Sequence, residues 1–257
     1  MVALTDPGLV REHNEDMVFA NPARGLVILA DGMGGYNAGE VASNMAIAFL
    51  SSAMETSFFD PVRKKSGFSA RRSACECLEE SIERANLAIY NASLDEPQYA
   101  GMGTTLVMSV FFNNRIAVAH IGDSRLYRLR DERFGAMTHD HSLLQEQIDR
   151  GMISLEEARF AQNRNLVTRA LGVEPLVEAE IHEYDVSPGD LYLFCSDGLN
   201  DMLADEEIHT TLRASASLEL AADQLIRMAN DNGGRDNVSV ILVKVLRAFS
   251  GRPGGKE

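Results

Sequence analysis

The sequence predicts an α+β fold, a four-layer αββα sandwich in which two central antiparallel β-sheets are flanked by pairs of helices. Two observations predict this fold. Segments with strand character and segments with helical periodicity follow the order strands, two helices, strands, two helices and a final strand. Most strand segments are joined by short turns, which favour antiparallel pairing, and two pairs of helices can cover the outer faces of two packed sheets.

Three short apolar segments near the N-terminus predict the first strands: residues 2–5, 17–20 and 26–29. The segment 21–25, which contains proline and glycine, is typical of a hairpin turn between the second and the third of them. Six further strands are predicted later in the chain: residues 106–112, 115–121, 125–129, 177–184, 191–195 and 238–245.

Helical periodicity predicts the two helix pairs. Apolar residues recur at the spacing of one helical face in residues 38–54 and 69–94, which form the first pair. The same spacing occurs in residues 204–212 and 217–230, which form the second pair. The polar segment 58–68 between the first two helices is expected to be a loop.

We expect a single domain over residues 1–246, because no linker rich in proline, serine or glycine divides the chain. A disordered tail is expected at residues 247–257. The polar, weakly patterned segment 143–172, with short helices expected at 143–150 and 155–160, is predicted to form a mobile flap beside the functional site.

The composition restricts the class of protein. Of the 257 residues, 45% are hydrophobic, which is enough for a large core, and the formal net charge of -14 repels nucleic-acid phosphates. No apolar run reaches the roughly 18 residues of a membrane span, and the N-terminus lacks a signal region. We therefore expect a cytoplasmic protein that binds neither nucleic acid nor membrane. The three cysteines do not suggest a disulfide framework.

Residues 26–35 read Leu-Val-Ile-Leu-Ala-Asp-Gly-Met-Gly-Gly and place Asp31 at the end of a buried strand. The glycines that follow allow the backbone to approach an ion closely. Residues 191–198 repeat the pattern, because an apolar strand runs into Asp197 and Gly198. A carboxylate in this context suits a cation site, although Asp-Gly is also an ordinary turn signal.

Four more acidic side chains are expected at strand edges: Glu15, Asp16, Asp123 and Asp236. Clustered carboxylates repel one another, so a cluster of this size is tolerable only with cations between its members. Oxygen ligands favour Mg²⁺ or Mn²⁺ over zinc, and two such ions activate a bridging water for in-line displacement at phosphorus. A plainer alternative remains for three of these residues: Glu15 and Asp16 in a solvated charge run, and Asp123 as a turn residue.

Arg11 has two interpretations. Its guanidinium group can bind two phosphate oxygens at once, or it can form a salt bridge with Glu12 or Asp16. The glycine spacing of residues 34–39 matches a P-loop, but the lysine that a P-loop requires is missing, so nucleotide binding there is excluded.

Six short motifs occur in order along the chain: Arg11-x-x-Asn14-Glu15-Asp16, Asp31-Gly32-Met33-Gly34-Gly35, Gly103-Thr104-Thr105, Gly122-Asp123-Ser124-Arg125, Ser196-Asp197-Gly198 and Asp236-Asn237. Together they resemble the motif set of the metal-dependent protein phosphatase family (PPM, or type 2C), and most closely its bacterial serine/threonine phosphatase branch. The resemblance covers residues 1 to about 246, and six motifs in order are far more specific than any single one.

The resemblance implies the αββα sandwich and the hydrolysis of phosphoserine and phosphothreonine. It also implies that Asp31 bridges two metal ions, Mn²⁺ or Mg²⁺. Asp197 and Asp236 would complete the binding of one ion. Glu15 and the carbonyl group of Gly32 would complete the binding of the other.

Further roles follow from the same resemblance. Asp16 would orient water, and Arg11 would hold the substrate phosphate. Asp123, together with Asp197, matches a third metal site described for bacterial members. The segment 143–172 falls where the family has its flap.

The sequence departs from the animal branch at one position. That branch has a histidine as the proposed general acid after Asp-Gly, and Met33 stands there in this chain. The proton for the leaving group must then come from water or from another residue, for which His141 is a candidate.

The implied partners are phosphorylated proteins, with a serine/threonine kinase and its substrates as the family expectation, and the implied state is a monomer. Two other functions compete with this interpretation. A binding or regulatory module on the same fold would have lost its metals, but the set of acids is intact. A metal-dependent nuclease would share the chemistry but not the strongly acidic surface.

Overall fold

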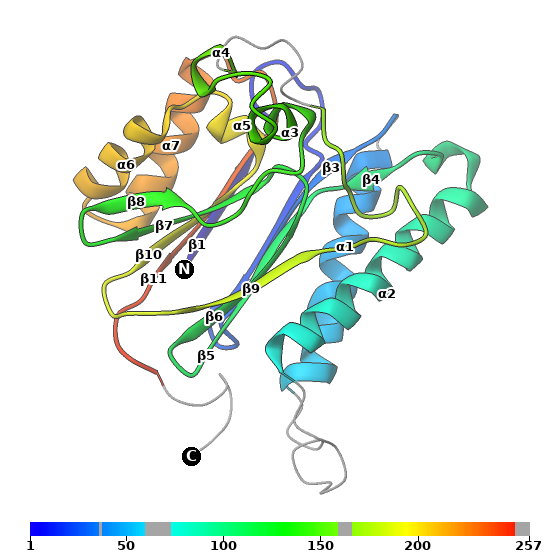
Figure 1. The fold of residues 1–257 in the computed structure, drawn as a ribbon, viewed down its shortest axis with the longest axis horizontal. Helices are drawn as coiled ribbons and strands as arrows, with labels where there is room; N and C mark the ends of the chain where they lie inside the picture. Colours follow the sequence, from blue (N-terminus) through cyan, green and yellow to red (C-terminus); the bar gives the residue numbers. More distant parts are fainter. Residues whose placement is uncertain (36–37, 60–72, 159–165, 250–257) are drawn as a thin grey trace, which may run out of the picture.

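The computed structural model describes residues 1–35, 38–59, 73–158 and 166–249. The loop and the tail expected from the sequence lie mostly outside these residues. The described chain forms four layers, in which two β-sheets pack face to face and helices cover their outer sides (Figure 1).

Both sheets are antiparallel. The strands of the first sheet are β1 (Val2–Asp6), β11 (Val238–Lys244), β10 (Leu191–Cys195), β7 (Arg125–Arg130) and β8 (Arg133–Ala136), in this order. The strands of the second are β2 (Asp16–Asn21), β3 (Leu26–Met33), β5 (Leu106–Phe112), β6 (Arg115–Ile121) and β9 (Glu180–Asp185), with β4 (Gly103–Thr104) beside β3. Every strand pair is antiparallel, which confirms the predicted fold class.

Two long helices cover each outer face of the sandwich (Figure 1). The second sheet is covered by α1 (Ala38–Met54), which continues into a π-helical turn (Glu55–Phe59), and by α2 (Ala74–Asp95). The first sheet is covered by α6 (Asp205–Ala214) and α7 (Leu218–Asp231). These are the two predicted helix pairs.

Three short helices gather at one end of the molecule (Figure 1). They are α3 (Leu143–Asp149), α4 (Leu155–Ala158) and α5 (Asp197–Asn200). A 3-10 turn (Pro97–Tyr99) follows α2 and leads into β4. The three short helices belong to the connections between strands, α3 and α4 between β8 and β9 and α5 after β10. Functional side chains tend to lie in such connections.

Three apolar layers fill the spaces between the elements, and β3 contributes to two of them. Leu26 and Ile28 pack against α1 and α2, whereas Val27 and Leu29 pack against the first sheet. Successive side chains of a strand point to opposite faces. A strand that is buried on both faces therefore reads as a continuous apolar run, as residues 26–29 do.

The start of α2 differs from the prediction for a local reason. The helix begins at Ala74 and not at residue 69, because Ser73 caps it. The Oγ atom of Ser73 accepts the N–H of Glu76 at 3.1 Å, and the Glu76 carboxylate accepts the N–H of Ser73 at 2.7 Å. These two bonds satisfy N–H groups that a helix start leaves without partners.

Several strands also differ from the prediction. β3 extends to Met33, four residues beyond its predicted end at residue 29, because β4 pairs with its last two residues. β9 begins at Glu180 and not at 177. The short elements β4, β8 and α5 were not predicted, because a periodic pattern cannot be recognised in so few residues.

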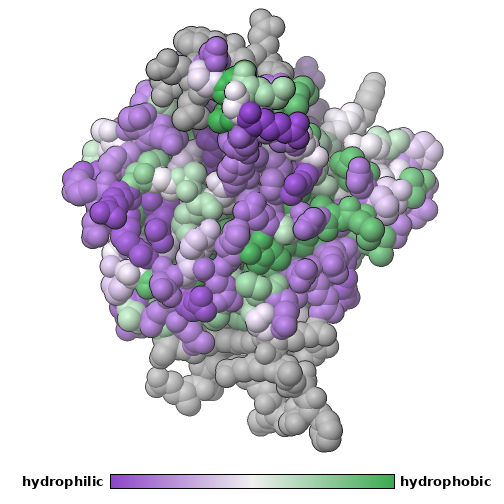
Figure 2. All heavy atoms as spheres, viewed as in Figure 1, coloured by the Kyte–Doolittle hydropathy of each residue, from purple (hydrophilic) through white to green (hydrophobic). Residues whose placement is uncertain are grey.

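Figure 2 shows polar side chains over most of one face of the molecule. Within the described residues, no helix combines the length and the apolar character that crossing a bilayer requires. This agrees with the absence of a long apolar run in the sequence.

Candidate metal centre

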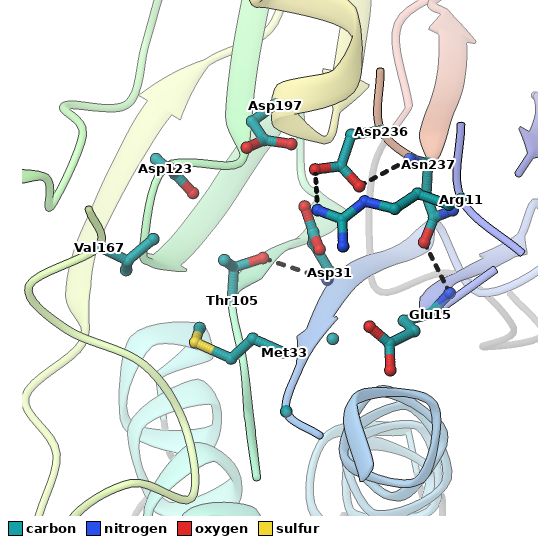
Figure 3. A pocket seen from close by; sticks show the side chains of 12 residues that line it. Arg11, Glu15, Asp31, Met33, Thr105, Asp123, Val167, Asp197, Asp236 and Asn237 are labelled. Atoms are coloured by element: carbon teal, nitrogen blue, oxygen red, sulfur yellow. Dashed lines mark hydrogen bonds and ion pairs between the residues drawn. The ribbon is translucent and has the colours of Figure 1, made fainter. Parts of the chain in front are cut away.

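A pocket of about 210 Å³ opens at the end of the sandwich, and acidic side chains from separate elements meet in it (Figure 3). Its acidic lining consists of Glu15, Asp31, Asp123, Asp197 and Asp236. Each of these residues stands near the end of a strand or in the turn beside one. The structure thus brings together five of the six acids that the sequence singles out.

The hairpin of β2 and β3 determines where Glu15 and Asp31 lie. Asp16 and Asp31 are direct partners in the antiparallel register, and the N–H of Gly32 donates to the carbonyl of Glu15 at 3.1 Å. A Cβ atom on Gly32 would lie 2.1 Å from the carbonyl oxygen of Gly39. Only glycine therefore allows β3 to pass this close to the start of α1.

Thr105 holds the backbone of Asp31 from the other side. Its N–H donates to the Asp31 carbonyl at 2.8 Å, and its Oγ1 accepts the N–H of Asp31 at 3.1 Å. The same hydroxyl lies 2.8 Å from the Oγ of Ser124, the residue after Asp123. One hydrogen-bond network therefore positions both Asp31 and the turn that carries Asp123. Thr105 belongs to a recognised motif, but its sequence position does not reveal this role.

Gly198 and Asn237 bring Asp197 and Asp236 together. A Cβ atom on Gly198 would lie 2.0 Å from the carbonyl oxygen of Asn237, so glycine is required where α5 packs against the start of β11. The Oδ1 of Asn237 accepts the N–H of Glu15 at 2.8 Å. Its Nδ2 donates to two carbonyl groups of the N-terminal loop at 3.0 and 2.9 Å. Sequence reasoning assigned no such role to Asn237, which a single polar residue beside an acid does not signal.

Asp16 lies behind the pocket wall and is only 3% exposed. Its Oδ2 accepts a hydrogen bond from the Oγ of Ser196 at 2.7 Å. Its Oδ1 has no hydrogen-bond partner among the residues that the structure describes. Burial is the main reason that the pKa of Asp16 rises to about 6.

Burial and mutual repulsion raise the pKa values of Asp31, Asp123 and Asp197 in the pocket. The pKa values of Asp31 and Asp197 lie well above the ordinary value, first because of burial and then because of neighbouring carboxylates. Burial also raises the pKa of Asp123 to about 7, and Asp140 adds to the shift. The buried Oδ1 of Asp197 has no hydrogen-bond partner in the described part of the chain. Carboxylate oxygens in this situation fit hard divalent cations such as Mg²⁺ and Mn²⁺.

Arg11 forms an ion pair with Asp236, at 2.6 Å between Nη2 and Oδ2. This contact differs from both salt bridges that the sequence left open, which involved Glu12 and Asp16. The hydrogen bond to Asp236 raises the pKa of the guanidinium group, so the group stays charged. Figure 3 shows it extending over the pocket near Asp31, and 51% of the side chain is exposed.

His141 does not line this pocket. It is buried, its Nδ1 accepts the N–H of Gly122 at 3.2 Å, and burial lowers its pKa to about 4. Among the described residues that line the pocket there is no histidine, and the side chains of Met33 and Val167 are present. Val167, in the predicted flap, lines the pocket. It forms an isolated β-bridge with Ser142, which holds this residue in place.

Comparisons with known proteins identify relatives over nearly the whole chain. Residues 10–246 match the sequence model of a family described as protein phosphatase 2C. The serine/threonine phosphatase stp of Listeria monocytogenes is 38% identical over 243 residues, which cover 93% of each chain. The serine/threonine protein phosphatase PstP of Mycobacterium tuberculosis is 41% identical over 245 residues, which cover 95% of this chain and 44% of that protein.

Solved structures with the same architecture agree with these relatives. The serine/threonine phosphatase PstP/Ppp of Mycobacterium tuberculosis superposes with a TM-score of 0.84 at 39% identity, over 96% of this chain and 97% of that one. The catalytic domain of PstP in complex with two manganese ions superposes with a TM-score of 0.83 at 39% identity, over 95% of this chain and 97% of that one.

The crowding of the acids predicts how metal-free protein responds to Asp31→Asn. The folded-state pKa of Asp31 is raised above its unfolded-state value. The contribution of this carboxyl group to the free energy of unfolding is therefore lost as the pH rises through the folded-state pKa. At about pH 8, Asp31→Asn should therefore raise the thermal midpoint of metal-free protein by about 2–4 °C for each kcal/mol of repulsion removed. Differential scanning calorimetry in a chelator measures this shift.

The matched control for this experiment is Asp223→Asn, at an exposed position on α7. It should leave the midpoint unchanged. In addition, Mn²⁺ should stabilise the wild type more than Asp31→Asn. A lower midpoint for metal-free Asp31→Asn would show that repulsion at this position is not the dominant effect.

Proposed function

The chain belongs to the protein phosphatase 2C family and is a metal-dependent phosphoprotein phosphatase, and we propose that its acidic pocket is where phosphoserine and phosphothreonine of other proteins are hydrolysed. The observation that carries this assignment is the meeting of Asp31, Asp197 and Asp236 in one pocket. Burial and neighbouring carboxylates raise the pKa values of Asp31 and Asp197, and such perturbed groups are typical of a functional site.

In the proposed site, Asp31 lies between two Mn²⁺ or Mg²⁺ ions. Asp197 and Asp236 hold one ion, and Glu15 and the Gly32 carbonyl hold the other. When bound, such a pair of ions would lower the pKa of bound water toward neutral pH and would offset the negative charge of the phosphoryl group. The support is the set of carboxylate oxygens that line the pocket, together with the two manganese ions in the similar PstP structure.

Asp123 and Asp197 are proposed to hold a third ion. Both line the pocket, and the Coulomb repulsion of Asp123 contributes to the raised pKa of Asp197, so the two carboxylates are close. The network of Thr105 and Ser124 holds the Asp123 turn at this position. A cation between Asp123 and Asp197 would relieve their repulsion.

Arg11 is proposed to bind the substrate phosphate. Its ion pair with Asp236 uses Nη2 and leaves the other guanidinium nitrogens to donate to two phosphate oxygens. The half-exposed side chain can therefore orient the phosphoryl group above the acids.

Asp16 is proposed to orient the attacking water from behind Asp31. The Ser196 hydroxyl donates to its Oδ2, while its buried Oδ1 can accept a hydrogen bond from water. The pocket side chain at residue 33 is a methionine, which cannot donate a proton to the leaving oxygen. Solvent water is therefore the proposed source of that proton.

The substrates are phosphorylated proteins, and the finer assignments belong to the proposal. We infer that the protein works as a monomer in the cytoplasm and opposes a serine/threonine kinase. The serine/threonine phosphatases among its relatives support the kinase as the opposing enzyme. The lack of a bilayer-crossing helix among the described residues is compatible with this location.

Purified protein should hydrolyse p-nitrophenyl phosphate and a phosphothreonine peptide when Mn²⁺ is added, and a chelator should abolish both activities. Asp31→Asn should lower kcat by at least about a hundredfold, because the bridging position loses its negative charge. Release of nitrophenolate and of inorganic phosphate measures the two reactions.

Activity of Asp31→Asn near the wild-type level would refute the bridging role. If the wild type takes up no Mn²⁺ in a calorimetric titration and hydrolyses neither substrate, the chain is instead a regulatory module on a phosphatase fold. Circular dichroism shows whether each variant is folded.

Arg11→Ala should raise KM for the phosphothreonine peptide and lower kcat/KM by about 10- to 100-fold, because a charge-assisted contact to phosphate is lost. Arg11→Lys should recover only part of the loss, since lysine cannot bind two oxygens in a planar fork. Steady-state kinetics with saturating Mn²⁺ measures both effects. Arg227→Ala, at an exposed position on α7, is the control and should behave as the wild type.

A further inference from the structure

A second hollow of about 520 Å³ continues from the metal pocket. The two share Asp123 and Asp197, so a peptide whose phosphate lies in the metal pocket can extend directly into this hollow. One wall comes from α3 and α4 of the flap, and the other from the segment that joins α5 to α6. Figure 1 shows α3, α4 and α5 together at this end of the molecule. We call this hollow the flap groove.

Apolar side chains form part of the lining of the flap groove. Leu144 and Ile148 contribute from α3, and Met202 and Leu203 contribute from the segment before α6. All four are at least partly buried. This lining favours the aliphatic part of a ligand side chain.

The charged part of the lining is strongly acidic. Arg125 is a cationic side chain of the groove, but two of its nitrogens contact the Asp140 carboxylate at 2.6 and 2.9 Å, so these two charges compensate each other. Asp205 and Glu206 are further acids of the groove, in addition to the two shared acids. No cationic side chain of the described residues that line the groove is left to balance them.

Asp205 and Glu206 lie in the first turn of α6, and both are exposed. Asp205 accepts a hydrogen bond from the hydroxyl of Tyr127 at 3.1 Å. Within the described chain, no ion pair of the Glu206 carboxylate is found. Glu206 can therefore bind a cationic group that enters the groove.

We propose that the flap groove binds a lysine or arginine side chain next to the phosphorylated residue of the substrate, an inference that rests on the proposed phosphatase function. Lysine and arginine combine an aliphatic stem with a cationic head, which matches the apolar lining and the acidic rim. The substrate class is thus a phosphoserine or phosphothreonine protein with a basic residue beside the phosphate.

The overall charge of the enzyme gives an independent reason for this preference. The formal net charge of -14 repels a phosphorylated peptide, whose phosphate is doubly negative near neutral pH. A basic residue beside the phosphate offsets this repulsion. An acidic residue at the same place adds to it and also meets the carboxylates of the groove.

The test compares short phosphothreonine peptides of equal length that carry arginine, alanine or glutamate beside the phosphothreonine on one side or the other. In saturating Mn²⁺, arginine on one side should lower KM about two- to fivefold relative to alanine. Glutamate on that side should raise KM, and kcat should change little. The difference should shrink as NaCl increases from about 0.05 M to about 0.5 M, because salt screens exposed charges.

The variant Glu206→Lys should abolish the preference for arginine and improve KM for the glutamate peptide. Asp223→Lys makes the same change in net charge at an exposed position on α7 and should keep the preference. If both variants weaken the preference equally, the overall charge and not the groove is responsible, and the inference is overturned. Thermal denaturation checks the fold, and Glu206→Gln serves if Glu206→Lys is unstable.

Hydrolysis of p-nitrophenyl phosphate tests the phosphatase function separately from the flap groove, because this small substrate does not reach the groove. Suppose that the wild type hydrolyses p-nitrophenyl phosphate and also hydrolyses the arginine, alanine and glutamate peptides with the same KM for each peptide. The phosphatase function then stands, and the flap groove proposal fails. If the wild type hydrolyses none of the substrates in Mn²⁺, the proposed function fails and the inference fails with it.

Discussion

Electrostatic repulsion among buried carboxylates is the constraint around which this end of the molecule is built. Asp31 and Asp197 are buried close to other acids, and their pKa values are raised for that reason. A chain would not keep such an arrangement unless other interactions offset it. The apolar layers between the two sheets and under the helices supply that stability, because they hold β3, β10 and β11 in place whether or not the acids repel one another.

Neutral groups position the acids, and they do so through the backbone. Thr105 binds both polar backbone groups of Asp31, and Asn237 joins the start of β11 to the start of β2. Gly32 and Gly198 provide close backbone approach where any side chain would collide with a carbonyl oxygen. The buried Oδ1 of Asp197 is left without a hydrogen-bond partner among the described residues, which is the arrangement that a cation site needs.

Among the described residues, the arginine side chains that line the metal pocket and the flap groove are paired with carboxylates. Arg11 is bound to Asp236, and Arg125 is bound to Asp140. Within the described part of the chain, Arg11 is the positive charge offered to a phosphorylated substrate in the metal pocket, and bound ions would add to it. The net charge of -14 repels phosphorylated peptides in general. In the proposed flap groove, the acidic side chains attract a basic residue beside the phosphate and so favour peptides that carry one.

The sequence by itself determined the fold class, the strand and helix order, and the residues with the capacity to bind metal. Periodicity reveals those elements because burial on one face or two leaves a repeating pattern, and acids after apolar strands are visible as local motifs. Only the tertiary structure decided the partner of Arg11, the positioning roles of Thr105 and Asn237, the placement of His141 outside the pocket and the continuity of the groove with it. Each of these depends on contacts between residues far apart in the chain, which no local pattern of a single sequence encodes.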